Sequence, residues 1–317
     1  MGTDPGVTRK MGFTKEFNKL VTEERNERTM DLDTLDTHDL VDRVQAEDFE
    51  VAAAVKKVIP EIAKAIDIIT ERLKNGGKLI YFGAGTSGRL GVLDAAECQP
   101  TFGIEKDIVQ AFIAGGKNAM FRSFEDAEDQ KELGVTDATD AKITEKDVVV
   151  GVSSSGRTPY VMGAMTKAKE MGAAVISVVN NPDSTLSTIC DVTIAAVVGP
   201  EALTGSTRMK SGTAQKMILN LISTCTMVRL GKVYENLMID LKPTNYKLRE
   251  RAVSIISILG GVPRQLAEGA LVASHDKCKT AILMVKRKLA RAQAEELITK
   301  CGGSLRKALV AEITPQH

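Results

Sequence analysis

The sequence predicts an α/β protein: a doubly wound, parallel five-stranded sheet sandwiched by helices, followed by a small C-terminal helical domain. Short, continuously apolar runs alternate with amphipathic segments, which is typical of a parallel sheet whose strands are buried on both faces. Right-handed crossovers then distribute the helices over both faces of the sheet. We expect the strands at residues 78–82, 109–114, 147–152, 174–179 and 192–198.

Helices are expected where apolar side chains recur at three- and four-residue steps. That spacing runs from Val44 to Lys74, and Pro60 predicts a break within it, because proline disrupts a helix interior. The polar, acid-rich stretch 22–42 is expected to be an extended arm with short turns. Later helical segments are expected at residues 90–97, 118–129, 159–171, 184–190 and 207–230.

The stretch Lys242-Pro243-Thr244 predicts a boundary between two domains. Residues 22–242 would form the α/β domain with its N-terminal arm, and residues 243–317 the helical domain, in which glycine-rich breaks separate short helices. Residues 1–21 are expected to be a disordered start, and the opening MGTDPGVTRK resembles a tag remnant. That opening lacks the apolar core of a secretory signal.

The amino-acid composition argues against nucleic-acid binding, a metal site and a membrane span. Lys plus Arg total 42 and Asp plus Glu total 41, and this balance argues against a nucleic-acid-binding surface. The five cysteines and three histidines show no metal-ligand spacing, so we expect reduced thiols and no metal site. No run approaches the ~18 apolar residues of a membrane span. We therefore expect a cytoplasmic protein that binds no nucleic acid and no membrane.

Three polar loops carry the functional signal, because ligands of parallel sheets bind at the carboxyl ends of the strands. The first loop, GAGTSGR at residues 83–89, offers Gly85, Thr86 and Ser87 as candidate phosphate-binding residues. Glycines let a ligand approach the backbone closely, and a helix N-terminus attracts an anion. The glycines also match GxGxxG, but a dinucleotide site needs a ribose-binding acid that ends the second strand about 20 residues further on, and the stretch 102–106 stands there instead. A phosphate group is therefore favoured over a dinucleotide.

The second and third loops extend this polar edge. SSSGRTP at residues 153–159 presents hydroxyl and amide donors that suit phosphate oxygens, although a plain helix cap would need only one serine. Its candidate binding residues are Ser153, Ser154, Ser155, Arg157 and Thr158. In the third segment, residues 205–216, Arg208 and Lys210 are candidates for contact with an anionic or polyhydroxyl ligand. The alternative for this segment is an exposed helix start with solvated charges.

These segments together resemble a known family. GAGTSGRLGVLDAAECQPTFG at 83–103, GVSSSGRTPYV at 151–161 and GPEALTGSTRMKSGTAQK at 199–216 are similar to sugar isomerase (SIS) domains. Together with TEERN at 22–26 and FEDAED at 124–129, they resemble the N-acetylmuramic acid 6-phosphate etherases. The third segment is also similar to a signature of glucokinase regulatory proteins. Gln99 and Asp126 stand where the family pattern has proline and glycine, and neither departure removes a carboxylate.

The resemblance implies an SIS fold and cleavage of the D-lactyl ether of N-acetylmuramic acid 6-phosphate, with release of N-acetylglucosamine 6-phosphate and D-lactate. It implies no cofactor and a homodimer with the site near the subunit interface. By resemblance, Glu97 matches the acid that protonates the lactate oxygen, and Glu128 matches a candidate base for the C2 proton. The residues themselves leave open which glutamate is acid and which is base. Cys98, beside Glu97, is interpreted as a packing residue rather than a nucleophile.

Two other functions remain open on the sequence. An aldose–ketose isomerase of the same fold would remove the same C2 proton but keep the C3 oxygen. A non-catalytic sugar-phosphate sensor would normally carry a second SIS domain and lack Glu97. The Arg25-Asn26 arm could complete a neighbouring subunit's site or order the N-terminus. The tail from Tyr246 to Leu309 resembles a three-helix module of ubiquitin-associated type and is interpreted as packing or dimer support.

Overall fold

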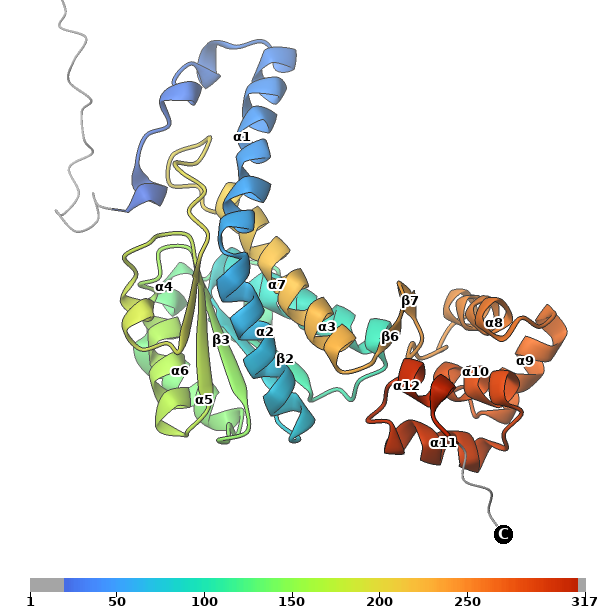
Figure 1. Ribbon diagram of the computed structural model, residues 1–317. Helices are drawn as coiled ribbons and strands as arrows, with labels where there is room; N and C mark the ends of the chain where they lie inside the picture. The colour runs from blue at the N-terminus through green and yellow to red at the C-terminus, as the bar shows by residue number, and fades with distance from the viewer. Residues whose placement is uncertain (1–19, 313–317) are drawn as a thin grey trace, which may run out of the picture. The chain divides into compact units, whose positions relative to one another are not determined.

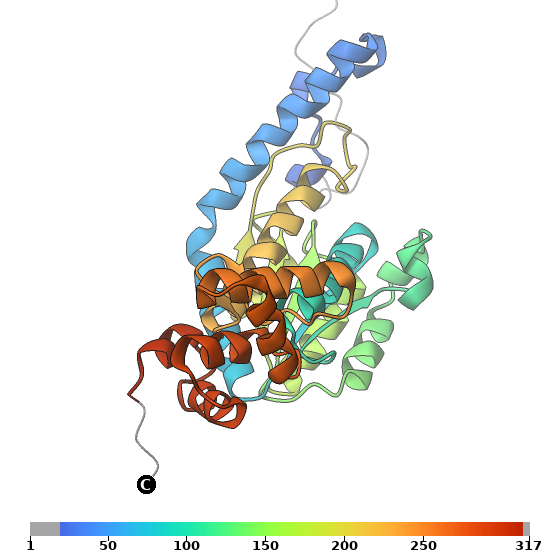
Figure 2. The ribbon, with the colours of Figure 1, turned by 90° about the vertical axis from the view of Figure 1, so that its right-hand side faces the viewer.

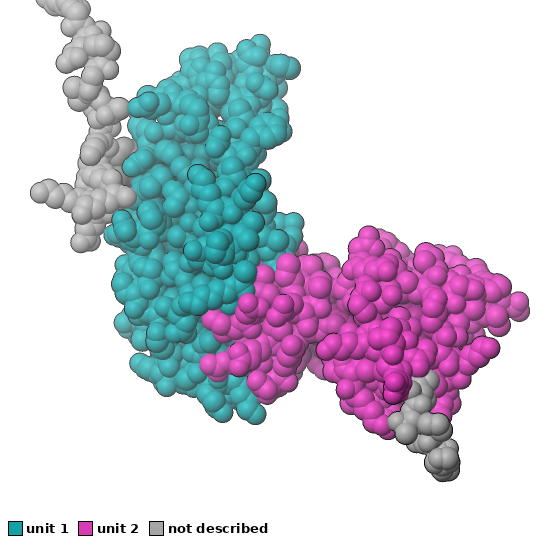
Figure 3. All heavy atoms as spheres, viewed as in Figure 1, with its two compact units in different colours: residues 1–65, 79–92, 111–221 teal, residues 66–78, 93–110, 222–317 magenta. Residues whose placement is uncertain are grey.

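The computed structural model describes residues 20–312, which form two compact units (Figures 1 and 3). Unit 1 takes residues 1–65, 79–92 and 111–221, and unit 2 takes residues 66–78, 93–110 and 222–317. Residues 1–21 were expected to be a disordered start. Residues 1–19 lie outside the described part of the chain, and Leu20 and Val21 lie within it. Leu20 is packed, with 4% of its surface exposed. The units interleave along the chain, so the domain boundary at residue 243 stays a prediction.

A five-stranded sheet in the order β2-β1-β3-β4-β5 forms the centre of the α/β fold. Neighbouring strands β1, β3, β4 and β5 pair in parallel, with Leu79 opposite Val148 and Val148 opposite Ala174. Every residue of β1, β3 and β4 is buried, which confirms the doubly wound fold expected from the continuous apolar runs. The strands are β1 (Leu79–Gly83), β2 (Val109–Ile113), β3 (Val148–Ser153), β4 (Ala174–Val179) and β5 (Val192–Ala195).

The strand order reverses between β1 and β3, so the loops that follow these two strands lie at the topological switch point, where open α/β sheets bind ligands. Helix α6 packs on β1, β3 and β4, and α5 packs on α6 (Figure 1). Tyr160, Ala164 and Met165 of α6 belong to this buried core. The helices along this part of the chain are α1 (Thr37–Lys57), α2 (Ile59–Lys74), α3 (Gly85–Phe102), α4 (Glu125–Glu128), α5 (Lys131–Asp140), α6 (Pro159–Glu170) and α7 (Lys210–Arg229).

The N-terminal arm agrees with the expected turns up to residue 35 and then differs. Three short 3-10 helices occupy Val21–Glu23, Glu27–Thr29 and Leu32–Thr34. Helix α1 begins at Thr37, earlier than expected, because the Asp36 carboxylate accepts the Asp39 N–H at 3.0 Å and caps the helix. The break before Pro60 is confirmed: α1 ends at Lys57 and α2 begins at Ile59.

The segment expected to be a helix at 118–129 is mostly irregular. It holds a 3-10 helix at Gly116–Met120 and the single turn α4. The real helix is α5, which begins at Lys131 and had not been predicted. Phe121 is 91% exposed and Phe124 is 46% exposed, so the apolar spacing that suggested a helix here does not correspond to a buried face.

The C-terminal part of unit 2 is a module of five helices, so the three-helix expectation is wrong. They are α8 (Tyr246–Gly260), α9 (Arg264–Ala273), α10 (Cys278–Arg287), α11 (Arg291–Lys300) and α12 (Leu305–Val310), preceded by the hairpin strands β6 (Val233–Tyr234) and β7 (Leu237–Met238). Helix α10 ends before Lys288, which adopts a φ of 53°, and α11 begins three residues later. Ile239, Ile256 and Leu271 share one buried core. In residues 20–312 no single helix meets the length and hydropathy of a membrane span, and α8 with α9 does so only as a pair bent by 110°.

Candidate active site

The first loop turns sharply from β1 into α3. A Cβ at Gly83 would lie 2.6 Å from the Gly88 nitrogen, and one at Gly88 would lie 2.7 Å from the Gly83 oxygen. Only glycines therefore permit this close approach of the strand end to the helix start. Helix α3 begins at Gly85, which places Thr86 and Ser87 in its first turn, where backbone N–H groups attract anions.

The second loop is held by its own hydroxyl groups. The Ser153 Oγ accepts the Gly156 N–H at 3.0 Å and lies 2.8 Å from the Thr158 Oγ1. The Ser155 Oγ accepts the Arg157 N–H at 3.2 Å. Pro159 then starts α6, so the loop ends at a second helix N-terminus. The Nε of Arg157 is buried and has no hydrogen-bond partner within residues 20–312.

Gln215 joins the two loops. Its side chain on α7 is fully buried, and its Oε1 accepts the Ser87 hydroxyl at 2.8 Å. Its Nε2 donates to the Ser154 Oγ at 2.9 Å and to the Asn180 Oδ1 at 3.0 Å. The structure thus brings the predicted residues Ser87 and Ser154 to one place. Gln215 and Asn180 were not among the predicted residues, although Asn180 directly follows β4, at the carboxyl end of a strand where parallel sheets bind ligands.

The third segment folds around a buried carboxylate. Glu201, which is fully buried, accepts the backbone N–H groups of Lys210 at 2.8 Å and Ser211 at 2.9 Å. A carboxylate in this position satisfies unpaired N–H groups and complements the positive end of the helix dipole. Arg208 precedes α7 and is exposed, as expected for a side chain that meets a ligand or solvent.

Lys210 is placed differently from the expectation. Only 1% of its side chain is exposed, and its Nζ lies 2.7 Å from the Glu47 Oε2 on α1. A buried ammonium needs such a partner. The Lys210 ammonium therefore pairs with Glu47 and does not face a ligand at the loops that follow β1 and β3. We therefore leave Lys210 out of the residues that contact a ligand directly.

Glu47 connects the N-terminal arm to the start of α7. It accepts hydrogen bonds from Arg28 at 2.5 and 2.7 Å and from the Asn26 Nδ2 at 2.8 Å. The Arg28 hydrogen bond, assisted by Lys210 and Asn26, lowers the pKa of Glu47 to about 2 despite its burial. Asn26 also donates to the Pro200 oxygen at 3.2 Å. Within this chain Asn26 therefore orders the third segment, and Figure 2 shows the arm and α1 beside the loop that precedes α7.

The two candidate catalytic carboxylates are both exposed. Glu128 is the last residue of α4 in unit 1, and Glu97 lies on the part of α3 that belongs to unit 2. One turn before Glu97, the buried Asp94 accepts the Ser223 hydroxyl at 2.9 Å. Burial, and then the nearby Asp94, raise the pKa of Cys98 to about 12, so the thiol stays protonated and fits a packing role. The catalytic pairing of Glu97 with Glu128 stays a prediction.

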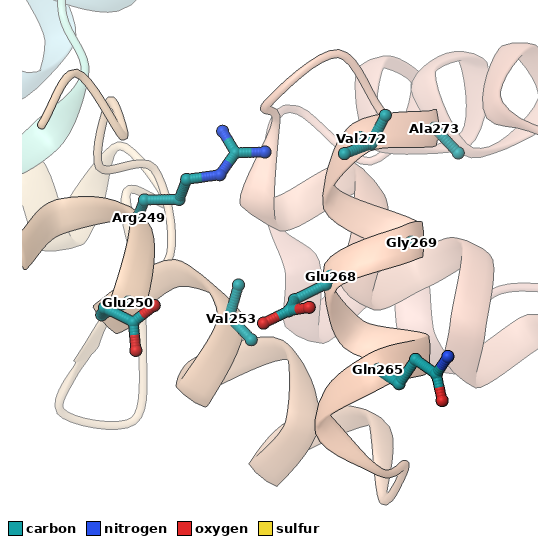
Figure 4. Close-up of a pocket in the computed structure, with 8 residues that line it drawn as sticks. All are labelled: Arg249, Glu250, Val253, Gln265, Glu268, Gly269, Val272 and Ala273. Carbon is teal, nitrogen blue, oxygen red and sulfur yellow. The ribbon is translucent and has the colours of Figure 1, made fainter. Parts of the chain in front are cut away.

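A pocket of about 520 Å³ lies between α8 and α9 in unit 2 (Figure 4). Its charged residues already have partners: Arg249 pairs with Asp276, and Glu250 and Glu268 both pair with Arg264. We therefore assign no ligand to it. Within the described range 20–312, no group of three or more His, Cys, Asp or Glu side chains could hold a metal ion.

Comparison with known proteins identifies the family. Proteins named N-acetylmuramic acid 6-phosphate etherase from Clostridium botulinum strain Okra and Enterobacter sp. strain 638 are each 50% identical to this chain over 293 residues. These alignments cover 92% of this chain and 97% and 99% of the two relatives. The chain belongs to the N-acetylmuramic acid 6-phosphate etherase family. A Vibrio cholerae etherase of the same name, numbered 2, is also 50% identical, over 92% of this chain and 95% of its own.

Domain models agree with the etherase family. The SIS domain model matches residues 126–224, and the model of the glucokinase regulatory protein N-terminal SIS domain matches residues 61–169. Solved structures with weaker likeness include a phosphoheptose isomerase from Neisseria gonorrhoeae, 18% identical with a TM-score of 0.47, over 60% of this chain and 98% of that one. Another is an Escherichia coli CFT073 protein in complex with A5P, 20% identical with a TM-score of 0.46, over 61% of this chain and 93% of that one.

Proposed function

We propose that this chain cleaves the D-lactyl ether of N-acetylmuramic acid 6-phosphate and releases N-acetylglucosamine 6-phosphate and D-lactate, in the recycling of cell-wall amino sugars. The observation that carries this proposal is the 50% identity to named etherases across 92% of the chain. It makes the enzyme a carbon–oxygen lyase. The polar loops at the switch point of the sheet supply a matching site for the substrate's phosphate.

The phosphate is assigned to the helix N-termini that follow β1 and β3. Two such N-termini, with hydroxyl groups in their first turns, offer many donors to an acceptor-only dianion. The buried, unpaired Nε of Arg157 supports an anion beside the second loop, because a buried guanidinium nitrogen without a partner is costly. The proposed phosphate-site residues are Gly85, Thr86, Ser87, Ser153, Ser154, Ser155, Arg157 and Thr158, with Arg208 near the sugar.

The chemistry is an elimination followed by an addition. In the open-chain sugar the C1 aldehyde acidifies the C2 proton, which a base removes. The C3–O bond then breaks, and the lactate oxygen takes a proton from an acid. Water adds to the unsaturated aldehyde at C3 and restores a hydroxyl group. Glu97 and Glu128 are the proposed acid and base, and two carboxyl groups in different surroundings can divide these roles.

A homodimer in the cytoplasm belongs to the same proposal. Glu97 and Glu128 are exposed in the single chain, whereas an elimination intermediate needs an enclosed site that controls water access. Exposed apolar side chains that a second copy would cover include Val41 and Phe49 on α1, exposed by 62% and 72%. The cytoplasmic location is supported by the sequence alone, through cysteines without disulfide or metal-ligand spacing.

The test is D-lactate release from N-acetylmuramic acid 6-phosphate by the purified protein, measured with D-lactate dehydrogenase. N-acetylmuramic acid without the phosphate is the control and should react far more slowly, because the phosphate loops supply much of the binding energy. Formation of a ketose phosphate without lactate would instead support an isomerase. Substrate binding without any turnover would support a sensor.

A further inference from the structure

The orientation of the Gln215 amide is fixed by its surroundings. The Ala196 backbone oxygen can only accept, and the Asn180 Nδ2 donates to it at 2.9 Å. The Asn180 Oδ1 must then face the other way, where it lies 3.0 Å from the Gln215 Nε2. Asn180 and Gln215 are 1% and 0% exposed, so water cannot replace these bonds easily. The nitrogen of Gln215 therefore faces Asn180, and its oxygen faces Ser87.

The orientation of the Gln215 amide determines the hydrogen-bond directions of the Ser87 and Ser154 hydroxyl groups. The Ser87 hydrogen is committed to the Gln215 Oε1 at 2.8 Å. The Ser154 oxygen accepts from the Gln215 Nε2 at 2.9 Å, so the Ser154 O–H must point elsewhere. Ser154 is only half-buried, and within residues 20–312 its hydroxyl makes this one side-chain bond. A phosphate oxygen is an acceptor, which is the partner that the Ser154 O–H lacks.

We propose that Gln215 is a positioning residue that makes Ser154 a hydrogen-bond donor to the substrate's phosphate. It also holds the Ser87 hydroxyl as a link between the two loops, so that Ser87 offers the phosphate only its backbone N–H in the first turn of α3. The proposal rests on the proposed function for the identity of the ligand. The donated bonds run in one direction from the Ser87 hydroxyl to the Gln215 Oε1 and from the Gln215 Nε2 to the Ser154 Oγ, so each donated bond polarises the next. Gln215 thereby strengthens the Ser154 hydrogen bond without touching the substrate.

Three variants test this chain of bonds. Ser154→Ala removes the donor, and Gln215→Met removes the positioning amide while roughly keeping the side-chain volume. Gln215→Glu replaces the amide nitrogen by an accepting oxygen, which would draw the Ser154 proton away from the phosphate. The control is Ser177→Ala, which loses a buried hydrogen bond to Thr193 of 3.1 Å in the sheet and leaves both loops intact.

The readouts are the Kd for N-acetylglucosamine 6-phosphate, from titration calorimetry, and the KM and kcat for lactate release. A lost hydrogen bond to a charged group predicts about 10- to 100-fold weaker binding for Ser154→Ala and for Gln215→Glu. KM should rise similarly while kcat changes by less than about threefold, because the phosphate is remote from the reacting carbons. In a protein that already carries Ser154→Ala, Gln215→Met should weaken binding almost no further. Ser177→Ala should match the wild type.

A Kd for Ser154→Ala within about twofold of the wild type would overturn the proposal, and this variant tests it even where a Gln215 variant fails to fold. The proposal would also be overturned if the Kd changes of Ser154→Ala and Gln215→Met multiply fully in the double variant. Gln215 would then act independently of Ser154, as a merely structural residue. If the wild type binds the phosphosugar but releases no lactate, the proposed function fails while the Kd comparison still decides the role of Gln215. A wild type that does not bind this ligand would overturn both.

Discussion

Replacement of Glu47 by Gln removes the negative charge at the centre of the cluster that links the arm to α7. The Lys210 ammonium, 2.7 Å away and 1% exposed, would then face a neutral amide in a buried position. Removal of one partner from a buried ion pair costs about 3–5 kcal/mol. The pKa of Glu47, lowered from 4.5 to about 2, corresponds to about 3 kcal/mol at 1.36 kcal/mol per pKa unit for all of its partners together, with Arg28 the largest cause. Both figures predict a substantial loss of stability.

The assay is urea unfolding followed by far-UV circular dichroism, because the chain has no tryptophan to report on unit 1. Hydrogen exchange of peptides from α1 and from the start of α7 would locate the loss. Asp31→Asn is the matched control, since it breaks the surface ion pair between the arm and Arg43 of α1. Exposed pairs of this kind contribute about 0–1 kcal/mol.

A loss of less than about 1 kcal/mol for Glu47→Gln, equal to that of Asp31→Asn, would show that the Glu47–Lys210 pair contributes no more than a surface ion pair. The double variant Glu47→Gln, Lys210→Met gives a second check. Because it removes both charges, it should be less destabilised than the sum of the single variants. Strict additivity would mean that the two side chains do not interact.

Three further predictions concern acid stability, the second loop and thiol reactivity. The pKa of Glu47 is lowered in the folded state, so its carboxylate stabilises the fold fully above pH 4.5 and loses this effect as the pH falls toward 2. The melting temperature of the wild type should therefore drop more steeply between pH 4.5 and 2 than that of Glu47→Gln. Gly156→Ala places a Cβ 2.1 Å from the Ser184 Cβ at a φ of +66°, and should lower the melting temperature and weaken phosphosugar binding. Gly261→Ala is the control, because Gly261 has the same φ but no atom within 4 Å of the added Cβ, so it measures the cost of backbone strain alone. Iodoacetamide at pH 8 should modify the buried Cys98, whose pKa is about 12, roughly 10³-fold more slowly than an ordinary thiol, and peptide mass spectrometry that finds equal rates would contradict its burial.

The sheet and its polar loops were predictable because their signals are local. The strands β3 and β4 are buried throughout, so their sequences are continuously apolar. The glycines and serines that follow β1 and β3 stand at the strand ends, where the fold class already places ligands. Ser87 and Ser154 could therefore be predicted to lie close together, and in the structure Gln215 bonds to both.

The polar partners of these residues carry no comparable local signal. Gln215 lies within α7 and takes its role only from side chains 128 and 61 residues away, Ser87 and Ser154. Lys210 resembled a ligand-binding lysine because it follows Arg208 in a hydroxyl-rich segment. Its true partner, Glu47, is 163 residues away on a helix whose apolar spacing had drawn attention to other positions. Long-range charge pairing of this kind is visible only in the folded chain.

The elimination mechanism is tested by proton NMR of the reaction with N-acetylmuramic acid 6-phosphate in deuterated water, for the wild type and for Glu97→Ala. We expect the wild type to release D-lactate and to leave deuterium at C2 of the product. Glu97→Ala should still exchange the C2 proton of the substrate but release almost no lactate, because the departing oxygen lacks its acid. Lactate release by the wild type without deuterium at C2 would contradict the elimination route, and undiminished release by Glu97→Ala would contradict the role assigned to Glu97.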